Sequence, residues 1–125
     1  MKDIETREDL VTLLTEFYKI ATIDEEIGHH FAKLDLETHL PVIVDFWEKT
    51  LFGKPVYFGN PFAVHQTLHE KSPLKLEHFQ KWFEIFSQTV DELFAGKMAD
   101  DAKLRAKMIA HSLNQNLNQN LNFGN

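Results

Sequence analysis

Apolar residues recur every three to four positions along most of the chain, a spacing that predicts a protein built from α-helices. The first stripe covers positions 10, 13, 14, 17, 18 and 21 and predicts a helix over 7–21. Thr6 stands where a side chain can cap that helix, and Glu8 and Asp9 suit the positive end of its dipole. A second, shorter helix is expected to begin at Asp24 and to finish near Phe31.

Four further segments show the same helical period. One covers 36–51 and ends at Gly53 and Pro55, and the next begins at Pro61 and stops before Pro73. The longest amphipathic stripe covers 76–94, with Gly96 expected as its C-cap, and the last helix starts near 99. Since no segment alternates with period two between turns, the predicted fold class is all-α, with about six helices and no sheet.

The length of 125 residues predicts a single domain that spans 1–125 and buries its own core. The sequence NQNLNQNLN dilutes the apolar stripe of the last helix. We therefore expect residues from about 118 to 125 to form a polar tail that tends to disorder.

Charge and cysteine content remove several classes of function. A formal charge of −6 repels phosphate backbones and anionic lipids, so neither nucleic acid nor a membrane is an expected partner. The absence of cysteine excludes disulfides, thiolate-bound iron, CxxCH haem attachment and cysteine-rich zinc sites. No signal-peptide core and no apolar run of membrane-spanning length are present, so we expect a protein of the reducing cytoplasm. Any metal must then be held by histidine or carboxylate.

Histidine is frequent, with seven residues, and is the commonest metal ligand. Four of them are interpreted as surface or capping residues: His29, His30, His78 and His111. His65 and His69 lie one turn apart on the same face of a helix, a spacing compatible with a surface pair, a zinc site or an iron ligand. A zinc site needs a third ligand such as His39, and HQTLH lacks the glutamate that a metalloprotease uses as a base. His69 precedes a short loop and the aromatic helix over 76–94, so we expect it to face an apolar cavity.

Four segments together resemble the group III truncated haemoglobins. They are FYKI at 17–20, HLPVIVDFW at 39–47, YFGNPFAVHQTLH at 57–69 and HFQKWFEIFSQTVDELF at 78–94. The resemblance covers about residues 10–112 and depends on the spacing between the segments as well as on their letters. Leu36 departs from the family, which often has tryptophan there, and the NQNL tail is not a family feature.

The resemblance implies a truncated globin fold, a two-over-two helical sandwich around non-covalently bound haem b. It implies His69 as the iron ligand, thirteen residues before Trp82, and Tyr18, Trp82 and His39 as donors toward a bound gas. Four apolar residues are expected to complete the haem pocket: Phe31, Ile43, Phe46 and Trp47.

The implied function is binding of O2, NO or CO, with donors that retain the gas and suit redox chemistry such as NO dioxygenation or a peroxidase-like reaction. Turnover requires an unidentified reductase, since the chain carries no second cofactor motif. Three alternatives stay open: a helical sensor or interaction module with an empty or non-haem cavity, a zinc hydrolase using His39, His65 and His69, and an electron-transfer protein in which His39 also ligates iron.

Overall fold

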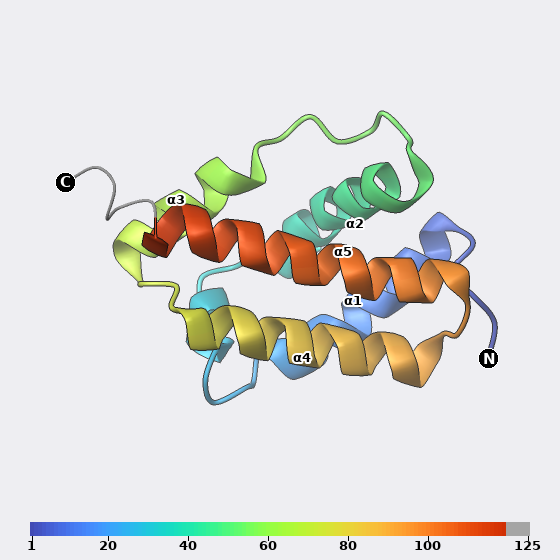
Figure 1. The fold of residues 1–125 in the computed structure, drawn as a ribbon, viewed down its shortest axis with the longest axis horizontal. Helices are drawn as coiled ribbons and strands as arrows, with labels where there is room; N and C mark the ends of the chain where they lie inside the picture. Colours follow the sequence, from blue (N-terminus) through green and yellow to red (C-terminus); the bar gives the residue numbers. More distant parts are fainter. Residues whose placement is uncertain (120–125) are drawn as a thin grey trace.

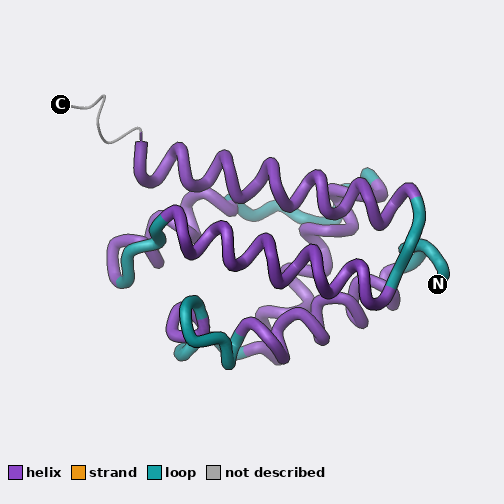
Figure 2. The backbone as a smooth tube through the Cα atoms, turned by 60° about the horizontal axis from the view of Figure 1, so that its bottom comes forward, coloured by secondary structure: helices purple, strands orange, loops and turns teal. Residues whose placement is uncertain are grey.

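The structure, a computed structural model, describes residues 1–119, and every regular element among them is helical. Figure 2 shows these helices joined by loops, with no strand in the described part. The elements are α1 (Arg7–Ala21), η1 (Gly28–Phe31), α2 (Leu36–Phe52), α3 (Pro61–Lys71), α4 (Leu76–Leu93), α5 (Lys97–Asn114) and the π-helical turn η2 (Gln115–Gln119). The all-α prediction is confirmed, and no helix of the described residues has the length and apolar character to cross a membrane.

Helix α1 has the predicted bounds and the predicted cap. The Thr6 side chain accepts a hydrogen bond from the backbone N–H of Asp9, and the Asp9 carboxylate accepts one in return from the N–H of Thr6. Arg7 then joins α1 to α2 by donating to Asp45 and to the buried carboxylate of Glu48. The first turn of α1 is therefore fixed both locally and against its neighbour.

The helix expected from Asp24 is shorter than the sequence indicates. The Asp24 carboxylate accepts from the N–H groups of Glu26 and Ile27, which stabilises a turn, and only Gly28–Phe31 follows as a 3₁₀-helix. Ile27 is buried in the core and anchors this segment. The segment leads into α2 through Asp35, which caps α2 by accepting from Glu37.

The four long helices form two layers. α4 and α5 run side by side in front of α1 and α2 (Figure 1), with α1 packed against both α2 and α4. The aromatic stripe of α4 faces the interior, where Phe86 is fully buried against Phe17 of α1 and Trp47 of α2. The predicted two-over-two sandwich is confirmed.

Gly96 corrects one boundary. α4 ends at Leu93 with Phe94 as its C-cap, and Gly96 is the N-cap of α5, which begins at Lys97. Its φ of 140° is strained for any residue with a side chain, and an added Cβ would lie 2.6 Å from the carboxyl carbon of Asp3. Glycine is required there because Asp3 comes close in order to cap α5.

The described part of the polar tail continues α5. Leu117 is buried, and the amide of Asn118 donates to the carbonyl of Leu74 and to the side-chain oxygen of Asn114. These contacts place residues up to 119 in η2. The remainder of the expected disordered tail, 120–125, lies outside the described residues.

Candidate functional site

A cavity of about 320 Å³ lies between α1, η1, α2, α3, α4 and α5, a size at the lower end of the range for ligand pockets. Its wall is mostly aliphatic and aromatic, with four histidines among the lining residues: His30, His39, His65 and His78. An apolar cavity with a few imidazoles suits a large flat ligand that needs hydrophobic contact and a small number of directed bonds.

His65 provides one wall of this cavity. It lies one turn after the start of α3. At that start, Asn60 caps the helix by accepting from the N–H of Ala63, and Pro61 occupies the first helical position. The Nδ1 atom of His65 lies 2.7 Å from the carbonyl oxygen of Pro61, so Nδ1–H donates and the lone pair remains on Nε2. Burial lowers the pKa of His65, and the bond to Pro61 offsets only part of that effect, so the ring is neutral near pH 7.

His69 does not line the cavity, contrary to the expectation from sequence. It lies in the last turn of α3, and its Nδ1 accepts a hydrogen bond of 2.9 Å from the backbone N–H of Leu74. This bond fixes the loop that leads into α4. His65 therefore lies on the cavity wall, whereas His69, one helical turn later, stabilises the loop between α3 and α4.

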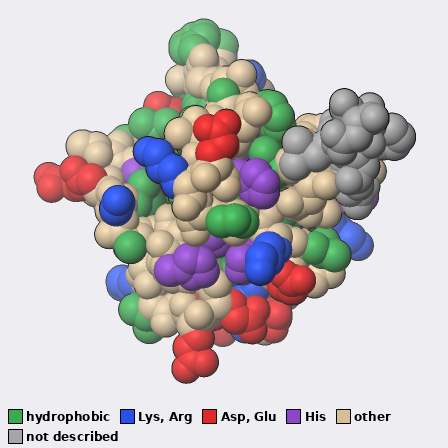
Figure 3. Space-filling view, turned by 90° about the vertical axis from the view of Figure 1, so that its left-hand side faces the viewer, with side chains coloured by type: hydrophobic (Ala, Val, Ile, Leu, Met, Phe, Trp, Pro, Cys, Tyr) green, Lys and Arg blue, Asp and Glu red, His purple; other side chains and the backbone are tan. Residues whose placement is uncertain are grey.

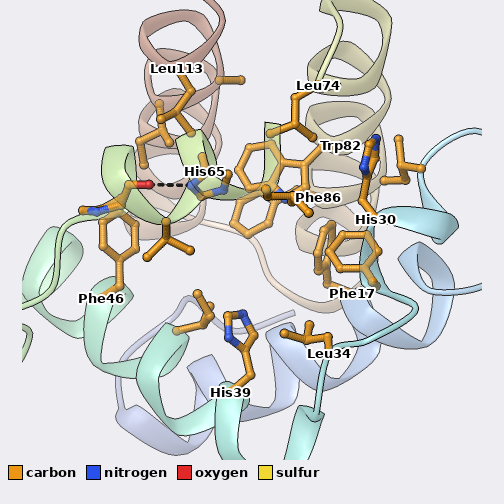
Figure 4. Close-up of a pocket in the computed structure, with 18 of the residues that line it drawn as sticks. Phe17, His30, Leu34, His39, Phe46, His65, Leu74, Trp82, Phe86 and Leu113 are labelled. Atoms are coloured by element: carbon orange, nitrogen blue, oxygen red, sulfur yellow. Dashed lines mark hydrogen bonds between the residues drawn. The ribbon is translucent and has the colours of Figure 1, made fainter. Parts of the chain in front are cut away.

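Tyr18 and His39 face the cavity opposite His65. Figure 4 shows His39 and His65 on opposite sides of the open space, from α2 and α3 respectively. The Tyr18 hydroxyl lies 3.2 Å from Nε2 of His39. Burial raises the pKa of Tyr18 far above its ordinary value, so the hydroxyl keeps its proton and stays a donor. Burial, and then the nearby His65, lower the pKa of His39.

A stack of aromatic rings holds Trp82 at the cavity. Trp82 is stacked on Phe86 at a centroid distance of 5.6 Å, and Phe86 is stacked on Trp47 at 4.9 Å. Trp82 and Phe86 line the cavity, whereas Trp47 lies behind Phe86 and does not reach it. Trp47 is therefore a core residue that supports the wall, and the structure does not place it in the pocket, contrary to the expectation.

The structure brings together six of the eight residues expected at the site: Tyr18, Phe31, His39, Ile43, Phe46 and Trp82. Its other lining residues include three ring-bearing side chains that were not expected in the pocket, His65, Phe17 and Phe86. Their signal was present in the sequence, because all three lie on the apolar stripes or share the helix face of a selected residue. Periodicity alone does not separate the part of a buried face that lines a cavity from the part that fills the core.

Comparison with known proteins assigns the class of this fold. The sequence model of the bacterial-like globins matches residues 2–117, and the chain belongs to that family. It is similar to the group 3 truncated hemoglobin ctb of Campylobacter jejuni, with 26% identity over 110 residues that cover 83% of this chain and 84% of the relative. The crystal structure of the group III truncated hemoglobin from Campylobacter jejuni superposes with a TM-score of 0.82, covering 94% of this chain and 95% of that one, also at 26% identity. The chain is therefore a bacterial-like globin, a class of haem protein that binds small gases, and it is similar to the group III truncated hemoglobins.

The residues of the cavity fit a haem. A globin holds haem iron by one neutral imidazole whose second ring nitrogen is bonded to a protein acceptor, and the Nδ1–H of His65 is bonded to Pro61 in this way. The cavity wall between His65 and His39 is apolar, as a porphyrin requires. His39, His65 and His69 do not come close enough together to form a metal-binding group in the described chain, so the structure lends no support to a zinc hydrolase.

Proposed function

We propose that this globin binds haem b without covalent attachment, with His65 as the protein ligand of the iron, and retains O2 or NO beneath Tyr18, His39 and Trp82. Ferrous haem supplies a centre that binds diatomic gases. The observation that carries the proposal is the 2.7 Å bond from His65 Nδ1 to the Pro61 carbonyl, which leaves Nε2 as the lone-pair atom of a cavity-lining imidazole.

The Pro61 bond has two effects on His65. It selects the tautomer with an unprotonated Nε2, and it holds the ring in one orientation. It also draws electron density toward Nε2, because a hydrogen bond from Nδ1–H increases the basicity of the other nitrogen. His69 lacks this arrangement, because its Nδ1 accepts a bond instead of donating one.

On the opposite wall, Tyr18 supplies the principal hydrogen-bond donor. Its hydroxyl stays protonated at every ordinary pH, and its ring is fixed by edge contacts with Phe17 and Phe31 at 5.1 and 5.7 Å. The unprotonated Nε2 of a neutral His39 can accept from Tyr18 in the absence of gas, so the hydroxyl is oriented before a ligand enters. A gas that carries negative charge would compete with His39 for the Tyr18 hydroxyl.

Trp82, from α4, offers an indole N–H as a second donor at the cavity, and its stacking on Phe86 holds it in place. Two donors in a cavity with few polar groups slow the escape of a charged gas, since each hydrogen bond to a charged acceptor contributes roughly 1.5–3 kcal/mol. Slow release favours redox chemistry on the retained gas, such as NO dioxygenation or a peroxidase-like reaction, over delivery of the gas. Such turnover takes its electrons from a separate reductase.

Absorption spectroscopy tests this proposal. Haem titrated into the purified chain is expected to saturate at one equivalent and to give a sharp Soret band that shifts on reduction and again on addition of CO. If the absorption spectrum stays that of free haem, the chain does not bind haem, and the cavity would be assigned to another ligand. A ferrous spectrum typical of two histidine ligands in the absence of gas would instead support electron transfer through His39.

A further inference from the structure

A cluster of three histidines lies at the edge of the cavity, separate from His65 and His39. His29 and His30 come from η1 and His78 from the first turn of α4, and one nitrogen atom of each lies within 4.8 Å of the others. The ring centroids of His29 and His30 are 4.0 Å apart, and those of His30 and His78 are 4.7 Å apart. Figure 3 shows histidine side chains close together on this face of the molecule. In the sequence His30 and His78 are 48 positions apart, so no local spacing indicated a cluster, and both were interpreted as surface or capping residues.

The nitrogen positions match what a tetrahedral metal ion needs. Zinc–nitrogen bonds of about 2.0–2.1 Å at a tetrahedral angle put two ligand nitrogens roughly 3.4 Å apart. Nε2 of His30 and Nδ1 of His78 are separated by 3.4 Å. The remaining nitrogen, from His29, belongs to an exposed side chain that can turn toward the pair without disturbing the core.

The hydrogen bonds around the pair also suit metal binding. His78 Nδ1 accepts from the backbone N–H of Lys75 at 3.0 Å, so this atom carries a lone pair. If a metal binds that lone pair instead, the exposed N–H of Lys75 can bond to water. Nδ1 of His30 lies 3.2 Å from the Ser72 hydroxyl. With Nε2 of His30 on a metal, its Nδ1–H can donate to Ser72, which is the outer partner that metal-bound imidazoles ordinarily have.

We propose that His29, His30 and His78 bind one divalent transition-metal ion of the zinc or copper type, with Ser72 positioning His30. Three imidazoles without a carboxylate in the group select such an ion over Ca²⁺ or Mg²⁺, which prefer oxygen ligands. Three protein ligands leave a fourth position open to water. The site is independent of haem iron, because none of the three residues is assigned to the iron or to the gas.

The ion would fasten parts of the fold that adjoin the cavity. His30 and His78 both line the cavity, from η1 and from α4, and Ser72 belongs to the loop between α3 and α4. A shared ion therefore links η1 to α4. An ion that binds only the folded chain raises its thermal stability, and the increase grows with the logarithm of the free metal concentration.

Isothermal titration of Zn²⁺ into the metal-free full-length chain, prepared without a histidine tag, tests the site. One equivalent is expected to bind, and His29→Ala and His78→Ala are each expected to weaken binding by more than about tenfold. Ser72→Ala should weaken it by about tenfold, as is usual for an outer partner. His111→Ala is the matched control, since His111 is exposed in the last turn of α5 and lies outside the cluster.

His29 is exposed and does not line the cavity, so His29→Ala keeps the fold and the haem site, and circular dichroism and the haem spectrum check this. Zinc should also raise the melting temperature of the unaltered chain and of His111→Ala, but not that of His29→Ala. Unchanged zinc affinity in both His29→Ala and His78→Ala would overturn the proposal, as would the absence of a stoichiometric site in the unaltered chain. Because the readout is zinc, these outcomes do not depend on whether haem binds.

Discussion

Replacing Tyr18 by phenylalanine removes one hydroxyl from the cavity and leaves the rest of the wall in place. The Tyr18 ring is 7% exposed and makes edge contacts with the rings of Phe17, Phe31 and His39. A phenylalanine ring keeps these contacts, so Tyr18→Phe should fold and load haem as the unaltered chain does. The half-buried His39 loses one partner and can turn to water.

The lost hydroxyl is a donor to a gas that carries partial negative charge. A hydrogen bond to a charged acceptor contributes roughly 1.5–3 kcal/mol, and about 1.4 kcal/mol corresponds to a factor of ten in rate. O2 should therefore leave Tyr18→Phe about 10- to 100-fold faster, whereas CO, which gains little charge, should leave at nearly the same rate. Stopped-flow displacement of O2 by CO measures the first rate, and displacement of CO by NO measures the second.

Tyr57→Phe is the matched control. Tyr57 also lines the cavity, but it packs edge-on against Phe46, away from the bond between Tyr18 and His39. Loss of the Tyr57 hydroxyl should change the rate of O2 release by less than about twofold, as expected for a substitution away from specific hydrogen bonds. The reasoning is refuted if Tyr18→Phe releases O2 as slowly as the unaltered chain, or if both variants accelerate release equally.

Three further predictions concern the fold. Asp3→Ala removes the carboxylate that accepts from the first amides of α5 and should cost about 1 kcal/mol in urea unfolding. Burial tends to raise the pKa of Asp3, but bonds from three backbone N–H groups lower it below 3.8. The Asp3 carboxylate therefore contributes its full stabilisation above about pH 4, and this contribution is lost as the pH falls through the folded pKa. The stability difference between Asp3→Ala and the unaltered chain should shrink over the same range. Among the described residues, Arg7→Ala leaves Lys54, at 3.4 Å, as the remaining ion-pair partner of the 4% exposed Glu48, and it should cost about 1–3 kcal/mol. Glu48→Gln in the same background should restore part of this loss. Phe86→Ala opens a void between two stacked rings and should cost about 3–5 kcal/mol, so an unfolding midpoint close to that of the unaltered chain would contradict the packing described.

The sequence predicted the helices well where a local signal sets both ends. Thr6 and the apolar stripe after it determine α1, and the chain has no competing signal there. Gly96 was assigned to the wrong helix, because a glycine between two helices is compatible with a C-cap of the first and with an N-cap of the second. Its role depends on Asp3, which lies far away in the sequence and comes close only in the folded chain.

The site shows the same limit. His65 and His69 share one face of α3, so their spacing gives equal support to either as a ligand. What separates them is the partner of each ring, the Pro61 carbonyl for His65 and the Leu74 amide for His69, and the second depends on how the loop after α3 turns. Trp47 was placed in the pocket because it lies on an apolar face, and the intervening Phe86 ring is a feature of packing that periodicity does not report.

Iron ligation by His65 is tested most directly by comparing His65→Gly with His69→Gly, each supplied with haem and examined in the ferric, ferrous and ferrous-CO forms. We expect His65→Gly to lose the spectrum of a histidine-ligated haem and to regain it when free imidazole is added to fill the space. His69→Gly should keep that spectrum and show only reduced stability, because it loses the bond that orders the loop before α4. An altered spectrum in His69→Gly, rescued by imidazole, together with a normal one in His65→Gly, would contradict the assignment.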